Sequence, residues 1–240
     1  MEQKLRHMDI NFLFEKNSTC LAKLIITPLS PLSMVNSMPG SHFKCLKEPS
    51  KMMLTGLFEN ILDFHLSIND RKSIRKNIEK ELNKGSKKGE DKFSFEDSNS
   101  SYLPILSHLF KIDLIFNPSM TFFNDLWKRM YRRSDATVHP KGTPNLDYDL
   151  LPKKYKLPLD EKGKINNKDY EDLFKLNIGK FPLYYSTLSD REYIKLEGDY
   201  IIKLSIDTTL LELLNNAIEE NDLGYLGTND GWVSLKLEKL

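Results

Sequence analysis

The sequence has few of the residues that mark a disulfide framework, a metal site or a catalytic centre. Its 240 residues include only two cysteines, Cys20 and Cys45, which is too few for a disulfide framework and fits a reducing compartment. The five histidines include no pair at metal-ligand spacing, and no phosphate-binding loop, dinucleotide fingerprint or nucleophile elbow occurs. We therefore expect no metal, no cofactor and no catalytic residue.

Long apolar runs and an excess of one charge are also missing. No segment approaches the roughly 18 apolar residues of a membrane helix, and residues 1–16 carry too many charges for a signal peptide. We expect a cytoplasmic protein with no membrane contact. Basic residues number 35 and acidic residues 34, so a nucleic-acid site would have to gather its positive charge locally.

Apolar periodicity predicts a mixture of helices and strands. Residues 21–26 resemble a buried strand that Pro28 and Pro31 direct toward a sheet edge or a bend. Ser50 is expected to cap a helix whose apolar stripe ends at His65, with Thr55 and Glu59 on other faces. Further helices are expected at residues 70–88, 121–133, 167–176 and 208–221, and strands at residues 111–116, in a 192–204 hairpin and at 232–237.

The order of these elements predicts the fold class. Strands and helices do not alternate regularly, which favours an α+β protein with an antiparallel sheet. Residues 134–163 contain four prolines and no sustained period, and so long an irregular segment is normally functional or disordered. We expect an N-terminal domain over residues 1–163, with residues 164–240 completing the fold.

Two basic segments are the candidate binding sites. The first, residues 41–51, places His42 and three lysines before a helix start, where free amides and the helix dipole favour phosphate. The second combines cations for phosphates with aromatic rings for bases: Trp127, Lys128, Arg129, Tyr131, Arg132 and Arg133. The alternative for each segment is a solvated basic flank beside core-facing apolar residues.

Three parts of the sequence resemble the Cas-five family of CRISPR-associated proteins. Residues 48–62, Glu-Pro-Ser-Lys-Met-Met-Leu-Thr-Gly-Leu-Phe-Glu-Asn-Ile-Leu, are similar to the segment after that family's first strand. Residues 23–30 resemble the first strand itself, and residues 224–233 resemble the closing loop and strand of some members.

The resemblance implies a fold and a function. The family is built on a ferredoxin-like (RRM-type, RAMP) domain with an antiparallel sheet, an inserted thumb and a smaller C-terminal β-rich part. Its members bind crRNA in type I Cascade complexes, cap the 5′ handle, contact the backbone and large subunits, and meet target DNA only indirectly. The thumb would lie within residues 84–100 or 134–163.

The resemblance also assigns residues, by position. Pro49, Ser50 and Lys51 would hold handle phosphates, and Gly56 would allow close packing on the sheet. The RNA path would be lined by Gly40, His42, Lys44 and Lys47.

Two alternatives remain open from the sequence. Some members cleave precursor RNA, and His42 with a nearby lysine or tyrosine would suit metal-independent cleavage. The family's Gly-Arg-Arg element is absent, with residues 188–193 in its place, which argues against that subgroup. The other alternative is a generic protein-interaction module. His65 and His108 lie in apolar stretches and are expected to be structural.

Overall fold

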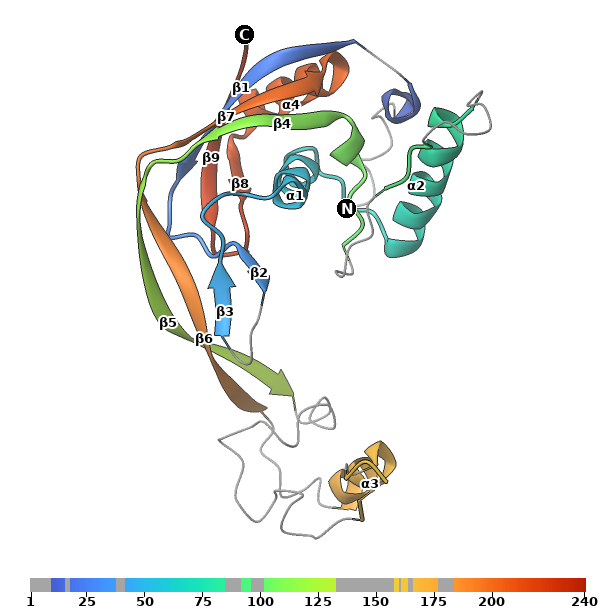
Figure 1. Ribbon diagram of the computed structural model, residues 1–240, viewed down its shortest axis with the longest axis vertical. Helices are drawn as coiled ribbons and strands as arrows, with labels where there is room; N and C mark the ends of the chain where they lie inside the picture. Colours follow the sequence, from blue (N-terminus) through green and yellow to red (C-terminus); the bar gives the residue numbers. More distant parts are fainter. Residues whose placement is uncertain are drawn as a thin grey trace. The chain divides into compact units, whose positions relative to one another are not determined.

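The largest sheet is an antiparallel five-stranded sheet, seen in the computed structural model of Figure 1. Its strand order is β4-β7-β1-β9-β8. The structure describes residues 10–15, 18–37, 42–84, 92–95, 102–132, 158–159, 161–163, 166–176 and 184–240. The five strands are β1 (Thr19–Pro28), β4 (Phe110–Phe116), β7 (Tyr200–Asp207), β8 (Leu223–Tyr225) and β9 (Trp232–Lys239).

Four of these strands and two helices form a ferredoxin-like arrangement. Along the chain the order is β1, α1 (Lys51–Ile61), β4, β7, α4 (Thr208–Glu220) and β9. In the sheet, β1 lies between β7 and β9, and β4 pairs with β7, with every pairing antiparallel. This is the split βαβ topology of the ferredoxin-like fold, so the predicted α+β RAMP-type fold is confirmed.

Alternation along the strands places the core on one face of the sheet. Ala22, Leu24 and Ile26 of β1 are fully buried, while Leu21 is exposed and Lys23 and Ile25 are partly exposed. The register pairs Leu24 with Ile202 of β7 and with Leu237 of β9, so the buried positions are adjacent across the sheet.

The first helix is positioned on that buried face by its apolar stripe. Leu54, Leu57 and Phe58 of α1 are buried, and the Ser50 side chain caps the helix by accepting a hydrogen bond from the Met53 amide at 3.3 Å. The helix ends at Ile61, earlier than expected. His65 therefore lies outside the helix and is exposed, which corrects the expected stripe.

The glycine that allows close packing of α1 is not the one expected. A Cβ at Gly56 would meet only the Tyr102 ring, at 3.7 to 3.9 Å, which is an ordinary contact. A Cβ at Gly224 of β8 would lie 2.6 Å from Leu57 Cδ1, so α1 reaches the sheet at Gly224. The role predicted for Gly56 is wrong.

The other two helices occur where periodicity placed them, within a few residues. Helix α2 (Ile68–Leu82) begins two residues before the expected 70–88 region and ends six residues before its end, and α3 (Asn167–Leu176) matches its predicted range. Ser67 caps α2, since its side chain accepts from the Asp70 amide at 3.2 Å. Short 3-10 turns occur at Asn11–Phe14 and Leu106–His108.

A long insertion separates β4 from β7. It contains β5 (Ser119–Arg132), α3 and β6 (Tyr184–Glu197). β5 and β6 are neighbours in a second sheet of order β2-β3-β6-β5, with β2 at Val35–Ser37 and β3 at His42–Cys45. The helix predicted for residues 121–133 is therefore wrong: residues 121–132 belong to β5, and Arg133 lies outside the described residues.

The hairpin predicted for residues 192–204 is also corrected. Both strands exist, but β6 and β7 belong to different sheets, because β7 pairs with β4 and β6 pairs with β5. The two chain segments leave the first sheet at Pro118 and Gly198, whose Cβ positions would be 3.4 Å apart. Gly198 has φ of 118°, a conformation that favours glycine.

The first strand lies in the sheet interior. β1 has neighbours on both sides, so of the two outcomes expected from its prolines, a sheet edge or a bend, the sheet edge is wrong and the bend is found at residues 29–30. Pro28 is the last residue of β1, where its missing N–H interrupts no further pairing, and the chain turns there.

The chain divides into two compact units. One contains Met1–Ser37, Lys44–Phe123 and Tyr193–Leu240, and the other contains Met38–Phe43 and Asn124–Glu192. The division expected after residue 163 adjoins residues 164–165, which lie outside the described residues, and it stays a prediction. Within the described ranges, no helix has both the length and the apolar composition to cross a membrane.

The closing loop resembling the family pattern is tied to the rest of the first unit. Gly227 has φ of 84°, and a Cβ there would lie 2.5 Å from the backbone oxygen of Ser33. Asp230 accepts a hydrogen bond from Tyr193 Oη at 3.0 Å, and its backbone oxygen accepts one from Ser30 Oγ at 2.7 Å. Gly227 and Asp230 of this motif therefore hold the loop against neighbouring parts of the first unit.

Candidate nucleic-acid interface

The segment leading into α1 is held to the rest of the first unit by hydrogen bonds of Cys45 and of the Lys47 backbone. Cys45 is buried, and its sulfur accepts a hydrogen bond from the Met34 amide at 3.0 Å. Tyr200 Oη donates to the backbone oxygen of Lys47 at 2.7 Å, which ties the loop to β7. Burial raises the pKa of Tyr200 above its ordinary value, so its phenol keeps the proton it donates.

The predicted residues at the helix start have different roles. Pro49 is buried and packs inside, and the Ser50 hydroxyl oxygen is the N-cap acceptor. Lys51 is exposed, with its Nζ 5.7 Å from the centroid of the Phe110 ring, while its backbone oxygen accepts from Thr55 Oγ1 at 2.8 Å. Of these three, Lys51 is the one that presents a charge to solvent.

Three lysines of this segment have no acidic partner. Lys44, Lys47 and Lys51 are exposed, and in the described part of the chain none has a carboxylate at ion-pair distance. The nearest acid in sequence, Glu48, instead accepts a hydrogen bond from Asn117 at 2.5 Å. The lysines are therefore free to neutralise the phosphates of a ligand.

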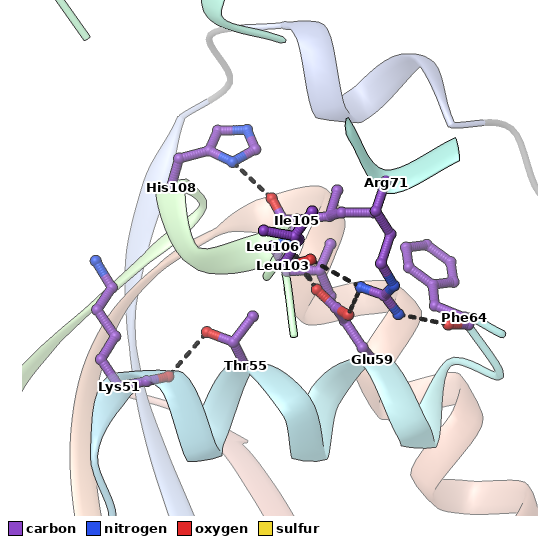
Figure 2. A network of polar contacts seen from close by, with 9 residues as sticks. All are labelled: Lys51, Thr55, Glu59, Phe64, Arg71, Leu103, Ile105, Leu106 and His108. Atoms are coloured by element: carbon purple, nitrogen blue, oxygen red, sulfur yellow. Dashed lines mark hydrogen bonds and ion pairs between the residues drawn. The ribbon is translucent and has the colours of Figure 1, made fainter. Parts of the chain in front are cut away.

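A buried ion pair fixes the helix that carries this segment (Figure 2). Arg71 Nη1 of α2 donates to Glu59 Oε2 of α1, with side chains 11% and 3% exposed. Glu59 Oε1 accepts from the Ile105 amide at 2.6 Å. Arg71 also donates to the backbone oxygens of Leu103, at 3.0 Å, and Phe64, at 2.9 Å.

The same network corrects a prediction and reveals residues that the sequence reasoning missed. Thr55 and Glu59, expected on other faces of the helix, are buried at 0% and 2% exposure. The sequence signal was Arg71, which lies three and seven residues before Ile74 and Ile78 and so shares their inward stripe. A cation on an inward stripe requires a buried acid.

A pocket of about 130 Å³ lies beside the start of α1. Phe93, Phe95 and His108 form mutual ring contacts with centroids 5.1 to 5.8 Å apart. The pocket is lined by Lys51, Met52, Phe93, Ser94, Phe95, Pro104, Ser107 and His108. It is mainly apolar, with Lys51 as its single charge among the described residues.

Of the described histidines, His108 is held by backbone contacts and His65 lies beside a surface carboxylate. Both ring nitrogens of His108 face backbone oxygens, of Ile105 at 2.9 Å and Leu13 at 3.0 Å, and burial lowers its pKa. This confirms its structural role. His65 Nε2 lies 2.8 Å from Asp63 Oδ1 on the surface. No group of three metal-ligating side chains occurs among the residues that were described.

The remaining predicted residues fall elsewhere. His42 belongs to the second unit, where β3 runs parallel to β6 with His42 opposite Asp190, and Arg191 lies 4.9 Å from the Phe43 ring. Gly40 and Arg133 lie outside the described residues. Five residues lie on β5, where their side chains are not described: Trp127, Lys128, Arg129, Tyr131 and Arg132.

The comparisons with known proteins identify a family. No curated protein matches the sequence. Two solved structures, described as the Type III-B Cmr-beta bound to cognate target RNA, the first also with AMPPnP, align at 15% and 14% identity, respectively, with a TM-score of 0.30 each. The alignments cover 89% of this chain but 62% and 63% of the Cmr-beta chains.

The family match extends over nearly the whole sequence. It covers residues 8–237 and includes the three segments that carried the resemblance, the helix-opening segment, the first strand and the closing loop. The chain belongs to the CRISPR-associated protein Cas5p family.

Proposed function

We propose that this chain is a crRNA-binding subunit of a CRISPR–Cas effector complex of type I, where it caps the 5′ handle. Membership of the Cas5p family supports the role in an effector complex. The observation that carries the RNA-binding part is a set of exposed lysines, Lys44, Lys47 and Lys51, for which the described residues supply no carboxylate at ion-pair distance. They lie on a segment that Tyr200 ties to β7. The proposed partners are crRNA and the backbone and large subunits.

The insertion between β4 and β7 is the proposed thumb. Residues 134–163, one of the two candidate segments, lie between β5 and β6 within the second unit. The other candidate, residues 84–100, follows α2 in the first unit. A separate compact unit suits a projecting element better than a connection within the main domain, which supports residues 134–163.

Handle binding is tested by removing the three charges. We expect Lys44→Gln/Lys47→Gln/Lys51→Gln to reduce the salt slope for repeat-derived single-stranded RNA by about 0.7 per contact, hence about 2 in total. At about 0.1 M salt this corresponds to roughly 100-fold weaker binding. The matched control removes three exposed lysines elsewhere: Lys111, Lys195 and Lys239.

The result is read by comparing RNA with and without the 5′ handle on the same gel. Loss specific to the handle RNA supports the proposal, and equal loss in both variants refutes it. We propose that the chain binds without cleaving, because both ring nitrogens of His108 face backbone oxygens, and His42, the candidate for cleavage, belongs to the second unit whereas Lys44, Lys47 and Lys51 belong to the first. A discrete product that persists in EDTA would instead identify a metal-independent endoribonuclease.

A further inference from the structure

Helix α2 carries a row of lysines on its outer face. Lys72, Lys76 and Lys80 repeat at a spacing of four and are all exposed. The opposite face carries Ile74, Ile78 and Leu82, which belong to or pack against the core. With a rise of about 1.5 Å per residue, the lysine row is about 12 Å long.

The acidic residues of α2 interact with groups other than these three lysines. Asp70 accepts from Ser67 Oγ at 2.7 Å, and Glu79 Oε1 accepts from the Phe95 amide at 3.0 Å. Glu81 pairs with Lys84 at 3.3 Å. In the described ranges, no carboxylate lies at ion-pair distance from Lys72, Lys76 or Lys80.

The two arginines of the helix hold it in place. Arg71 is buried in the Glu59 network, and Arg75 lies with its guanidinium 4.4 Å from the centroid of the Phe95 ring. Both therefore act on the inner side, while the lysines remain outside. Like charges at a spacing of four repel one another, so Lys72, Lys76 and Lys80 make α2 slightly less stable than a helix without this row would be.

We propose that Lys72, Lys76 and Lys80, the lysine row, bind the phosphate backbone of a nucleic-acid duplex. Their neighbours on the outer face are the polar residues Asn69, Ser73 and Asn77, all exposed. A protein partner would need an apolar centre, but the exposed apolar residue of this described face is a single one, Ile68, 53% exposed at the first position of the helix. A single strand would need aromatic rings for stacking, and α2 contains none. The row spans the rise of roughly three to four nucleotides of a duplex strand.

This interface is separate from the proposed handle site. The handle site consists of Lys44 and Lys47 before α1 and Lys51 at its first position, and it would bind a single strand. The lysine row lies on a different helix and requires no contribution from those residues. Each can therefore be tested while the other is intact.

The test uses the full chain and measures affinity for three probes by fluorescence anisotropy over about 50 to 200 mM salt. The probes are a DNA duplex, an RNA duplex and an unstructured single-stranded RNA. We expect Lys72→Gln/Lys76→Gln/Lys80→Gln to lower the duplex salt slope by about 0.9 per contact, hence about 2.7. At about 0.1 M salt this is roughly 500-fold weaker binding.

Two further variants make the outcome decisive. Replacing the same three lysines by arginine keeps the charge and should preserve binding, and the Lys111, Lys195 and Lys239 glutamine variant should leave the slope unchanged. If the glutamine variant loses affinity for only one of the two duplexes, that result tells whether the lysine row binds DNA or RNA. Equal loss in the control, an unchanged slope, or a loss as large for the single strand overturns the proposal.

Discussion

Removing one partner of the buried ion pair between Glu59 and Arg71 should be among the most destabilising single substitutions in the first unit. Glu59→Ala removes the acid and leaves the Arg71 guanidinium buried without its partner, while two backbone amides, of Ile105 and Leu106, lose their acceptor. Breaking a buried pair on one side costs about 3–5 kcal/mol. This is a large fraction of the stability of about 5–15 kcal/mol typical of a domain.

The losses of stability caused by removing Glu59 and by removing Arg71 should not add up in the double variant. Arg71→Met leaves the Glu59 carboxylate buried, so each single variant already loses the interaction. In a double-mutant cycle we expect the Glu59→Ala/Arg71→Met variant to be more stable than the sum of the single effects predicts, with a coupling energy of up to about 3 kcal/mol.

Urea unfolding followed by far-UV circular dichroism measures this. At a slope of about 3 kcal/mol/M, Glu59→Ala should lower the midpoint by more than about 1 M. Glu59→Gln keeps an oxygen for the Ile105 amide and is the milder variant if the alanine variant does not fold. The control is the exposed pair Glu81–Lys84 on α2, whose removal should cost less than about 1 kcal/mol. A Glu59→Ala effect no larger than this control would refute the reasoning.

Four further predictions concern three glycines and the pH dependence of stability. Gly56→Ala should stabilise the protein by up to about 1 kcal/mol, because its site is open and helical, whereas Gly224→Ala should lower the urea midpoint, since its Cβ would overlap α1. Gly227→Ala should cost more than about 1 kcal/mol, measured in the same way, because of its positive φ and a backbone oxygen at 2.5 Å; a neutral result would contradict the loop geometry. The folded-state pKa of His108 is lowered, so above pH 6.5 it is neutral in both states, and stability should fall as the pH drops from about 6.5 because the unfolded state binds the proton first. His108→Asn should reduce the acid sensitivity in that window, and an unchanged pH profile would exclude His108 as its source.

Sequence patterns predicted what depends on neighbours along the chain. The Ser50 cap, the range of α3 and the strand at Phe110–Phe116 follow from capping and periodicity, which act over a few residues. The ferredoxin-like fold and the family were predicted from short motifs, and the strand order and the family match confirm both.

Tertiary structure decided which elements meet. Residues 119–132 have a helix-compatible spacing of Phe122, Phe123 and Leu126, but pairing with β6, distant in sequence, makes them a strand. β1 became an interior strand for the same reason, since its partners come from the C-terminal part of the chain. Hydrogen-bond pairing between strands depends on long-range contacts that local propensity does not encode.

The same distinction applies to the candidate sites. Basic residues are visible in the sequence, but only the structure shows that Glu59 and Arg71 neutralise each other while Lys72, Lys76 and Lys80 have no partner in the described part of the chain. Whether a charge is available to a ligand depends on its distance from every other charge, and the fold sets those distances.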